Sequence, residues 1–431
     1  MERTKWYRIT ILAVICFFLT GCSKSLPDTY HEGSDYQYME RYEFLAFHQK
    51  GAGVQYFAKE HYLYYLDEGS DTLLPLCGKA DCLHDKETDL EKMQECNAYM
   101  ETKAVNTGII YCNGYLYYVD SRILSGPVLC RVSADGMKRE EVYKWEDTVN
   151  IEEWIVHRDV IYYTEHTYLS DKDGTEEQFA IKFFSLTDNV KKPENVYIAD
   201  KDMDVFTLAD LQAYGNFLYF QIHAQIKSEE ETTDDNFLDK LYLKMFIYDM
   251  KEGKIRELAL SDMPKNYRIQ RIAFWQDKLL FSPYDFKKED KDLRTWYTAD
   301  LDGSHIEVFM EGIEQGLYFC SDGKYLYLSN VNMVLSGKVE GTGTYKIYDK
   351  DLTLVDTVTL PFDSSFGESA VGNAEYMYII YEKAESEKET GGEKETEEES
   401  ETEWGGSYWD KSKIGSYHGS AFEMTDIKYE G

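Results

Sequence analysis

The stretch Asn113-Gly114-Tyr115-Leu116-Tyr117-Tyr118-Val119-Asp120 decides the fold of this chain. A turn with a polar residue and a glycine is followed by a short run of aromatic and aliphatic residues. Tyr, Phe, Val, Ile and Thr favour the pleated, half-buried surface of a β-strand. The stretch therefore predicts a strand that leaves a tight turn, and the chain's 37 tyrosines and seven prolines extend the prediction of β-structure to the whole chain.

The same phrase recurs along the chain. Its seven copies begin at Glu60, Asn113, Arg158, Gly215, Gln276, Asp322 and Asn373. Their spacing of roughly 45 to 60 residues is the range of propeller blades built from four short strands. A fixed period of this kind indicates an array of units that bury their apolar faces only against one another.

A second element completes each repeat. Apolar strands run into Asp or Gly turns at Cys130–Gly136, Phe246–Asp249, Thr298–Gly303 and Lys346–Asp349, and we interpret each as a third strand with its hairpin to a fourth. We predict an all-β fold, a seven-bladed β-propeller over residues 50–431, closed into a ring that leaves few sheet edges exposed. Residues 42–47 are expected to fasten the ring by pairing with the last blade. The alternative fold is a pair of β-sandwiches, which fits poorly with seven evenly spaced copies of the phrase.

The N-terminus has the pattern of an export signal. Basic residues precede an apolar run from Ile9 to Leu19, and Leu19-Thr20-Gly21-Cys22 follows. The run is too short to cross about 30 Å of hydrocarbon. The four residues Leu19-Thr20-Gly21-Cys22 resemble the lipobox of bacterial lipoproteins, which implies cleavage before Cys22 and a lipid on the sulfur of Cys22. Residues 1–21 are then the signal peptide and 22–49 a tether, and the lipid bilayer at the extracytoplasmic face of the cell membrane is a partner.

The charge of the chain argues against one class of binding partner. With 80 acidic and 46 basic residues, the net charge of −34 argues against nucleic acid. Part of this charge is local, because residues 382 to about 405 are rich in glutamate and almost without apolar residues. Such a composition buries too little surface to fold, so we predict a disordered acidic insert there.

The repeats and the lipobox together resemble lipoproteins of Gram-positive gut bacteria that carry β-propeller domains of unknown function. A more distant similarity is to receptor propellers with Tyr-Trp-Thr-Asp repeats. The resemblance covers roughly residues 52–430 and implies the fold and the cellular location of the protein. It does not imply a function, because propellers as a class serve many functions. Cysteine-bearing inserts at the corresponding place also occur in this lipoprotein family.

One such insert, at about residues 77–100, holds Cys77, Cys82, His84 and Cys96. Outside the cytoplasm disulfides are the usual state of paired cysteines, so a Cys82–Cys96 staple worth about 3 kcal/mol is the preferred interpretation, with the third thiol left for Cys112. The alternative is a tetrahedral zinc site made by the three thiolates and the imidazole. Its spacing is irregular, because His84 stands only two residues after Cys82 and requires a tight fold-back.

No catalytic signature is present in the sequence: the nucleophile elbow, the zinc-protease helix, the phosphate loop and the dinucleotide fingerprint are all missing. We therefore assign no catalytic residue. Trp404 and Trp409 border the acidic insert and are candidate ligand contacts at a hairpin tip. We expect a membrane-anchored module that binds a glycan, a peptide or an envelope protein. The alternative is an envelope hydrolase or lyase with its active site at the propeller channel, and enzymatic activity stays open with a binding role favoured.

Overall fold

The structure is a computed structural model that describes residues 45–47 and 55–429, with gaps at 68, 102–107, 123–125, 172–173, 228–239, 261–266, 286–292, 315, 331–342, 361–366, 371–374, 383–403 and 422. The strands follow one another in groups of four, with three short helical segments between them. In chain order the elements are β1 (Leu45–Phe47), β2 (Gln55–Lys59), β3 (Tyr62–Leu66), β4 (Thr72–Pro75), η1 (His84–Lys86), α2 (Leu90–Glu95), β5 (Ile109–Cys112), β6 (Tyr115–Arg122), β7 (Gly126–Ser133), β8 (Arg139–Lys144), β9 (Val149–His157), β10 (Val160–Asp171), β11 (Gly174–Ser185), β12 (Glu194–Ile198), β13 (Met203–Tyr214), β14 (Phe217–Ile226), β15 (Leu241–Asp249), β16 (Lys254–Glu257), β17 (Tyr267–Trp275), β18 (Lys278–Asp285), β19 (Arg294–Asp300), β20 (Glu307–Ile313), β21 (Tyr318–Ser321), β22 (Leu326–Ser329), β23 (Thr344–Tyr348), β24 (Leu354–Thr359), β25 (Gly367–Ala370), β26 (Tyr376–Glu382), β27 (Trp404–Asp410), η3 (Lys411–Lys413) and β28 (Thr425–Tyr429).

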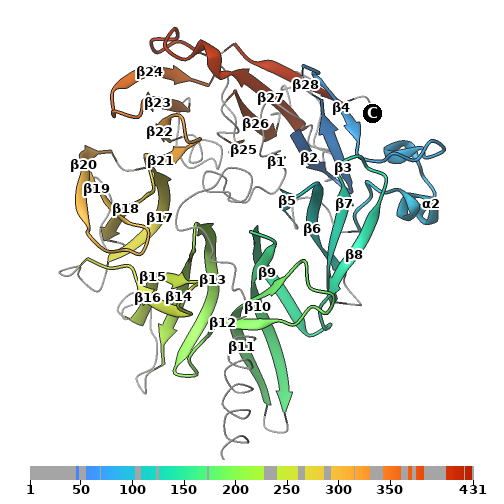
Figure 1. Cartoon of the computed structure of the whole chain (residues 1–431), viewed down its shortest axis with the longest axis horizontal. Helices are drawn as coiled ribbons and strands as arrows, with labels where there is room; N and C mark the ends of the chain where they lie inside the picture. The colour runs from blue at the N-terminus through green and yellow to red at the C-terminus, as the bar shows by residue number, and fades with distance from the viewer. Residues whose placement is uncertain are drawn as a thin grey trace, which may run out of the picture.

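The sheets stand around a common centre, as in a β-propeller (Figure 1). Five sheets have four strands each, and the sixth has eight in the order β1-β2-β3-β4-β28-β27-β26-β25. The predicted all-β propeller fold is confirmed. The predicted count of seven separate blades is wrong, because parallel pairing of β4 with β28 merges the first and last groups of strands, so that the described strands form six sheets.

This parallel pair also closes the ring. Lys428 lies opposite Thr72 and Tyr429 opposite Leu73, and the Lys428 amide donates to the Asp71 carbonyl at 2.6 Å. The expected fastening by residues 42–47 is wrong, because Leu45–Phe47 forms β1 and pairs with β2 at the other end of the same sheet. This extra strand also makes the first aromatic phrase, on β3, the third strand of its group, whereas the other phrases supply second strands.

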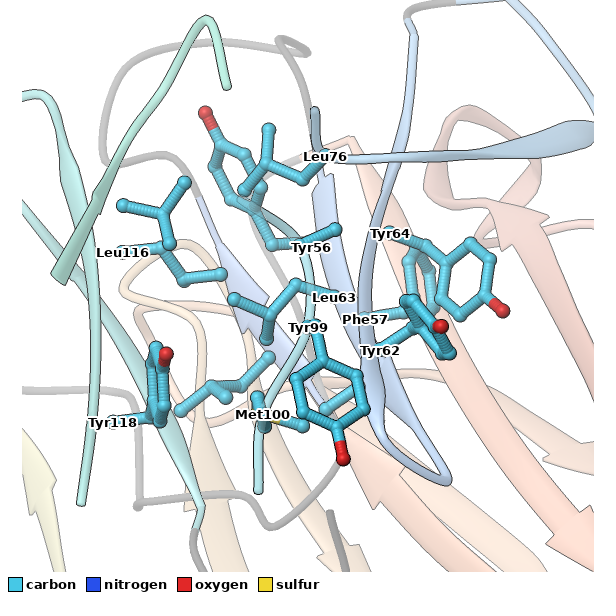
Figure 2. Packing of buried hydrophobic residues seen from close by; sticks show 14 of the residues in the cluster. Tyr56, Phe57, Tyr62, Leu63, Tyr64, Leu76, Tyr99, Met100, Leu116 and Tyr118 are labelled. Carbon is cyan, nitrogen blue, oxygen red and sulfur yellow. The ribbon is translucent and has the colours of Figure 1, made fainter. Parts of the chain in front are cut away.

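The aromatic phrases are explained by burial on both faces of a strand. Successive residues of a strand point to opposite faces, and in β14 both Tyr219 and Phe220 are fully buried. The Tyr219 ring packs 5.2 Å from Phe274 of β17, while Phe220 lies 5.8 Å from Tyr197 of β12. Neighbouring sheets thus cover this part of β14 from both sides, which is why Phe217–Phe220 is continuously apolar, whereas the rest of the strand alternates with Gln221, His223 and Gln225. Figure 2 shows the same kind of packing around Leu63, where side chains from β2, β3 and β6 meet.

The turns between first and second strands are linked from sheet to sheet. They lie at one edge of the ring, which we call the turn edge. Arg158 and Asp159 adopt φ of 51° and 62° in one of these turns, without glycine. The side-chain links are Asn113 Nδ2 to Asp159 Oδ1, Arg158 Nη1 to Asn216 Oδ1 and Tyr214 Oη to Asp277 Oδ1.

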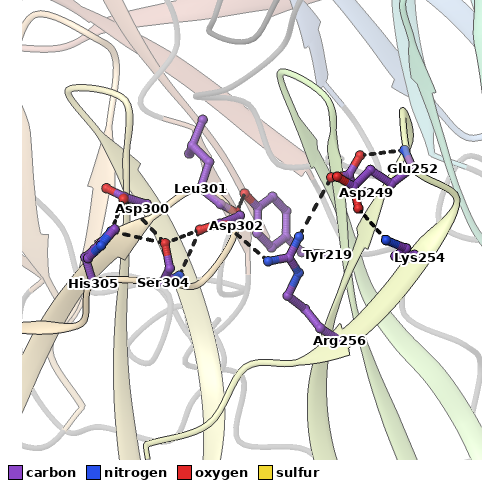
Figure 3. A network of polar contacts seen from close by, with 10 residues as sticks. All are labelled: Tyr219, Asp249, Glu252, Lys254, Arg256, Asp300, Leu301, Asp302, Ser304 and His305. Carbon is purple, nitrogen blue, oxygen red and sulfur yellow. Dashed lines mark hydrogen bonds and ion pairs between the residues drawn. The ribbon is translucent and has the colours of Figure 1, made fainter.

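Neighbouring sheets are also joined by their third-to-fourth-strand hairpins (Figure 3). Arg256 of β16 donates to Asp302 Oδ2 at 3.0 Å in the β19–β20 turn, and the Tyr219 hydroxyl donates to the Leu301 carbonyl at 2.7 Å. Asp302 is partly buried, which opposes its charge, but the Ser304 hydroxyl and amide and the Arg256 guanidinium hold its pKa below the usual value. The network fixes the spacing of two sheets.

A buried carboxylate organises the connection that follows η3. Asp356 of β24 is 4% exposed. Its Oδ2 accepts the amides of Gly415 at 2.6 Å and Tyr417 at 3.1 Å, and its Oδ1 accepts those of His418 and Thr357 at 2.8 Å each. Burial alone would raise the pKa of Asp356, but these N–H donors hold it below its ordinary value of 3.8.

An Asp356→Asn variant is expected to lose about 2 kcal/mol of stability at neutral pH, because the amide keeps one acceptor oxygen and turns donors toward the N–H groups. Since the folded pKa is depressed, the contribution of Asp356 is fully present at neutral pH and disappears as the pH falls below about 4. Urea unfolding at pH 7 and at pH 3.5 measures this difference. The exposed Asp351→Asn variant is the control, and equal losses in the two variants would contradict the account.

The signal peptide, Cys22, most of the predicted tether and residues 383–403 of the acidic insert lie outside the described residues. Within the described part of the chain, no helix has the length and apolar character needed to cross a membrane.

Candidate metal centre

All four residues predicted as metal ligands meet in the segment that joins β4 to β5. The nearest ligand atoms of Cys77, Cys82, His84 and Cys96 all lie within 4.8 Å of one another. Cys96 Sγ is 3.7 Å from His84 Nδ1. Tetrahedral zinc with bonds of about 2.3 Å to sulfur and about 2.0–2.1 Å to nitrogen separates its ligand atoms by roughly 3.5–3.8 Å. The arrangement has the size of a closed four-ligand site.

Local structure brings the ligands together. Leu83 is helical, with φ −82°, and His84 follows with φ 55° in the left-handed region, which reverses the chain after Cys82. This is the tight fold-back that the short Cys82–His84 spacing requires. Helix α2 then begins at its cap Asp89, whose side chain accepts the Glu91 amide, and ends at Cys96, which returns to extended backbone. The helix end therefore presents Cys96 to the other three residues.

The preferred prediction of a disulfide staple is corrected by this arrangement. None of the six described cysteines is in a disulfide. Cys112, the expected partner of the third thiol, lies in β5 and packs in a separate core with Tyr117 and Val119. The imidazole of His84 shares the site with three thiols, so the cluster matches a metal-ligand set better than a Cys82–Cys96 bridge.

The protonation of the ligands differs with their surroundings. Burial raises the pKa of Cys96 far above its ordinary value of 9.0. Burial also opposes ionisation of Cys77, but the backbone N–H groups of Lys79 and Asn97 outweigh it and lower its pKa. Burial lowers the pKa of His84 and favours the neutral imidazole that coordinates metals. Cys77 is thus better prepared to ionise than Cys96.

The β7–β8 turn supports the cluster from the neighbouring sheet. Asn97 donates from Nδ2 to the Gly136 carbonyl at 2.8 Å, and the Gly78 amide donates to the same oxygen at 3.0 Å. Arg139 Nη1 donates to the carbonyls of Cys96 at 2.9 Å and Tyr99 at 2.6 Å. Alternate turns of an antiparallel sheet lie at the same end, so the β7–β8 turn lies at the turn edge, as the β5–β6 turn does. The cluster contacts Gly136 in this turn, and it therefore lies at the turn edge and bridges two sheets.

Sequence reasoning missed these supporting residues, together with two tyrosines. The Tyr64 hydroxyl donates to Asp85 at 2.9 Å and holds η1 on β3. Tyr62 is 6% exposed, and burial, with the nearby Cys96 thiol next in effect, raises its pKa to about 12. Its buried hydroxyl has no hydrogen-bond partner among the described residues.

Gly136 is the position where a small change should disturb the centre most selectively. Its φ is +68°, and a Cβ there would lie 2.8 Å from the Cys77 amide nitrogen. We expect Gly136→Ala to displace Cys77 and weaken zinc binding by about tenfold or more, as loss of outer support does elsewhere. Gly253 has φ +65° in an equivalent turn with nothing within 4 Å, so Gly253→Ala carries the backbone strain alone. Equal zinc affinity in the two variants, measured by competition with a chromogenic chelator, would argue against the contact.

Of the two predicted tryptophan contacts, Trp409 is not at a surface. Trp409 is 1% exposed and packs 5.9 Å from Tyr417 in a core with Met377 and Ile379. The prediction that Trp409 is a solvent-facing ligand contact is wrong, because its side chain leaves β27 toward the neighbouring sheet and is buried there. The backbone of Trp404 begins β27, and its side chain lies outside the described residues.

Comparison with known proteins bears on the fold alone. No protein-family model and no curated protein matches the sequence. A solved structure from a study of two prolyl endopeptidases is similar with a TM-score of 0.52 at 12% identity, covering 91% of this chain and 51% of that one. An oligogalacturonate lyase in complex with manganese gives a TM-score of 0.49 at 12% identity, covering 83% of this chain and 92% of the lyase. The β-propeller domain of the Trilobed protease from Pyrococcus furiosus gives 0.37 at 11% identity, covering 66% of this chain and 72% of that chain. This chain spans about half the length of the endopeptidase.

Proposed function

We propose that the protein is an extracytoplasmic lipoprotein whose β-propeller is a binding module stiffened by one structural zinc ion. The observation that carries the zinc assignment is the mutual distance of the four ligand atoms, all within 4.8 Å. Four protein ligands fill a tetrahedral shell and leave no position for water or substrate, which is the mark of a structural site. Three thiols and an imidazole also select zinc over the oxygen-preferring divalent cations.

The position of the centre explains what the metal does for the ring. The segment between β4 and β5 has little regular structure, and its contacts run to β3 on one side and to the β7–β8 turn on the other. A metal ion that ties Cys77 to Cys96 holds this segment in place between two sheets. It therefore stabilises the part of the ring next to the closing β4–β28 pair.

The anchor is supported by the sequence Leu19-Thr20-Gly21-Cys22 after a short apolar run. Two acyl chains at Cys22 give stable membrane attachment without a spanning helix. Cells fed a labelled fatty acid are expected to transfer the label to the wild-type protein and not to a Cys22→Ala variant. Label retained in that variant would overturn the anchor.

The binding role rests on the propeller fold and the lack of a catalytic motif in the sequence. We propose a glycan, a peptide or an envelope protein as the ligand. Screening the mature chain on glycan and peptide arrays is expected to give a defined ligand that is bound and left chemically unchanged.

The second candidate is an envelope hydrolase or lyase that acts at the propeller channel. One observation favours it: His223 is half-buried, its Nε2 lies 2.8 Å from Gln221 Oε1, and partial burial together with the Arg268 guanidinium lowers its pKa, which keeps it available as a base. Turnover of an array ligand by the wild type, lost in His223→Gln, would replace the binding proposal with this one.

A further inference from the structure

The three thiols of the metal centre differ in how their sulfur atoms are held. Backbone N–H groups donate to Cys77 Sγ, from Lys79 and Asn97, and to Cys96 Sγ. Cys82 Sγ forms hydrogen bonds with the other two thiols, and no backbone N–H of the described residues donates to it. Hydrogen bonds to a thiolate draw charge from the sulfur and make it less nucleophilic. Cys82 therefore keeps the most reactive sulfur of the three.

The same thiol is open to solvent. Cys96 is only 1% exposed, whereas Cys77 and Cys82 are both partly exposed. Leu83, which follows Cys82 directly, is 59% exposed, so this end of the centre faces the surrounding water. A dissolved oxidant reacts with a cysteine only where it can reach the sulfur. Access and nucleophilicity thus coincide at Cys82.

The backbone around Cys82 is also the least firmly held part of the centre. The Cys82 amide donates to the Lys79 carbonyl at 3.4 Å, a long hydrogen bond. The Cys77 amide donates at 2.8 Å to a carbonyl of β4, and Arg139 grips the Cys96 carbonyl at 2.9 Å. The centre therefore has a fixed side, made by Cys77 and Cys96, and a side that can move once the metal ion no longer holds it.

We propose that the metal centre is a peroxide-sensitive switch, in which Cys82 is oxidised first, Cys77 closes a disulfide with it and the zinc ion is released. The inference rests on the proposed structural zinc and adds its regulation. Hydrogen peroxide is the oxidant. The Cys82 thiolate attacks one peroxide oxygen, the O–O bond breaks, and a sulfenic acid and a hydroxide ion result. The Cys77 thiolate then attacks the Cys82 sulfur, the S–S bond forms, the S–O bond breaks, and a second hydroxide leaves. The two thiolates lose the two electrons that the peroxide gains.

The disulfide leaves the metal ion with too few ligands. Only His84 and Cys96 remain of the four residues that fill a closed tetrahedral shell. The bridge also draws Cys82 toward the fixed Cys77 and away from these two residues, which frees η1 and the start of α2. Oxidation would thus unfasten the segment that the zinc ion holds between two sheets. The segment carries the exposed Lys86 and Lys92, where trypsin can cut when the backbone is free.

Titration of the zinc-loaded mature chain with hydrogen peroxide tests this switch. Released zinc is followed with a chromogenic chelator, free thiols are counted, and the bridge is mapped by peptide mass. We expect about one zinc ion to be released for every two thiols lost, a bridge between Cys77 and Cys82, and a reduced Cys96. Cleavage by trypsin at Lys86 or Lys92 should appear with zinc release, and a thiol reductant followed by zinc should reverse both changes.

Cys82→His is the informative variant, because two thiolates and two imidazoles still make a set that zinc accepts. It lacks the reactive sulfur, so it should release zinc about tenfold more slowly or worse. Cys320→Ser is the matched control, since it removes another partly exposed thiol from β21, and it should release zinc at the wild-type rate. If Cys82→His holds no zinc, the bridge mapped in the wild type decides alone.

Three results would overturn the switch and leave the structural zinc standing. They are zinc and thiols that persist in the wild type under excess peroxide, a bridge that joins Cys96 to either of the other two thiols, and equal rates of zinc release in zinc-loaded Cys82→His and the wild type. Reduced wild type that holds no zinc before peroxide is added would contradict the proposed structural site, and this inference would fall with it.

Discussion

Replacing Cys96 with serine is expected to reduce the zinc content of the purified protein from one equivalent to near zero. Cys96 is the most buried of the four ligands, and serine supplies no thiolate. Anything bound only to the folded state stabilises it, by about 4 kcal/mol when the metal is a thousandfold above its dissociation constant. The variant should therefore unfold at markedly lower denaturant concentration than the wild type, and its segment between β4 and β5 should be cut first by a protease.

A chelator provides the second arm of this experiment. It should lower the stability of the wild type to that of Cys96→Ser and leave the variant unchanged. Cys320→Ser is the control, because Cys320 lies in β21, away from the metal centre. Full zinc content in Cys96→Ser, or the same loss in Cys320→Ser, would contradict the assignment of the site.

The second large effect is expected at a buried ion pair between the last two groups of strands. The Lys411 ammonium contacts Asp322 Oδ2, and both side chains are fully buried. The Tyr327 hydroxyl donates to the same oxygen at 2.6 Å, and the Lys411 amide donates to the Glu375 carbonyl at 2.8 Å. Burial lowers the pKa of Lys411, and the Asp322 carboxylate opposes this effect.

Lys411→Met is expected to cost about 3–5 kcal/mol, because it leaves the Asp322 carboxylate buried without its cation. Adding Asp322→Asn should recover a large part of this loss, since the double variant buries no charge. Lys413→Met, two residues further on, removes an exposed ammonium paired with Glu423 and should change stability little. Guanidinium unfolding of the wild type, Lys411→Met, Asp322→Asn and their double variant measures the coupling, with Lys413→Met as the control. A loss in Lys411→Met no larger than that in Lys413→Met would contradict the role of the pair.

The strands could be predicted well from the sequence because each aromatic phrase marks a strand that is buried on both faces, and this pattern is visible within a few consecutive residues. The positions of β6, β10, β14, β18, β22 and β26 follow directly from it. The number of sheets could not be predicted in this way, because it depends on the pairing of β4 with β28, whose residues are far apart in the chain and carry no shared local pattern. The role of Leu45–Phe47 was mistaken for the same reason.

The metal centre was only half predicted. The four residues that gather were named as candidate ligands, but a location outside the cytoplasm made a disulfide the preferred interpretation, and the irregular spacing counted against zinc. The left-handed φ of His84 and the end of α2 at Cys96, which no spacing rule contains, bring the four ligands together. The supporting residues Arg139 and Gly136 were missed because they act from another sheet, and Asn97 was missed because the acceptor of its side chain is a backbone carbonyl of that sheet. For Trp409, a glycine-rich neighbourhood suggested a hairpin tip, whereas its place in β27 buries it.

The most direct test of the central claim is X-ray absorption at the zinc edge on the mature protein purified without added metal, with its zinc content and intact mass. The account predicts one zinc per chain with three sulfur ligands at about 2.3 Å and one nitrogen at about 2.0–2.1 Å. A protein without zinc, whose mass shows Cys82 and Cys96 joined in a disulfide, would contradict it.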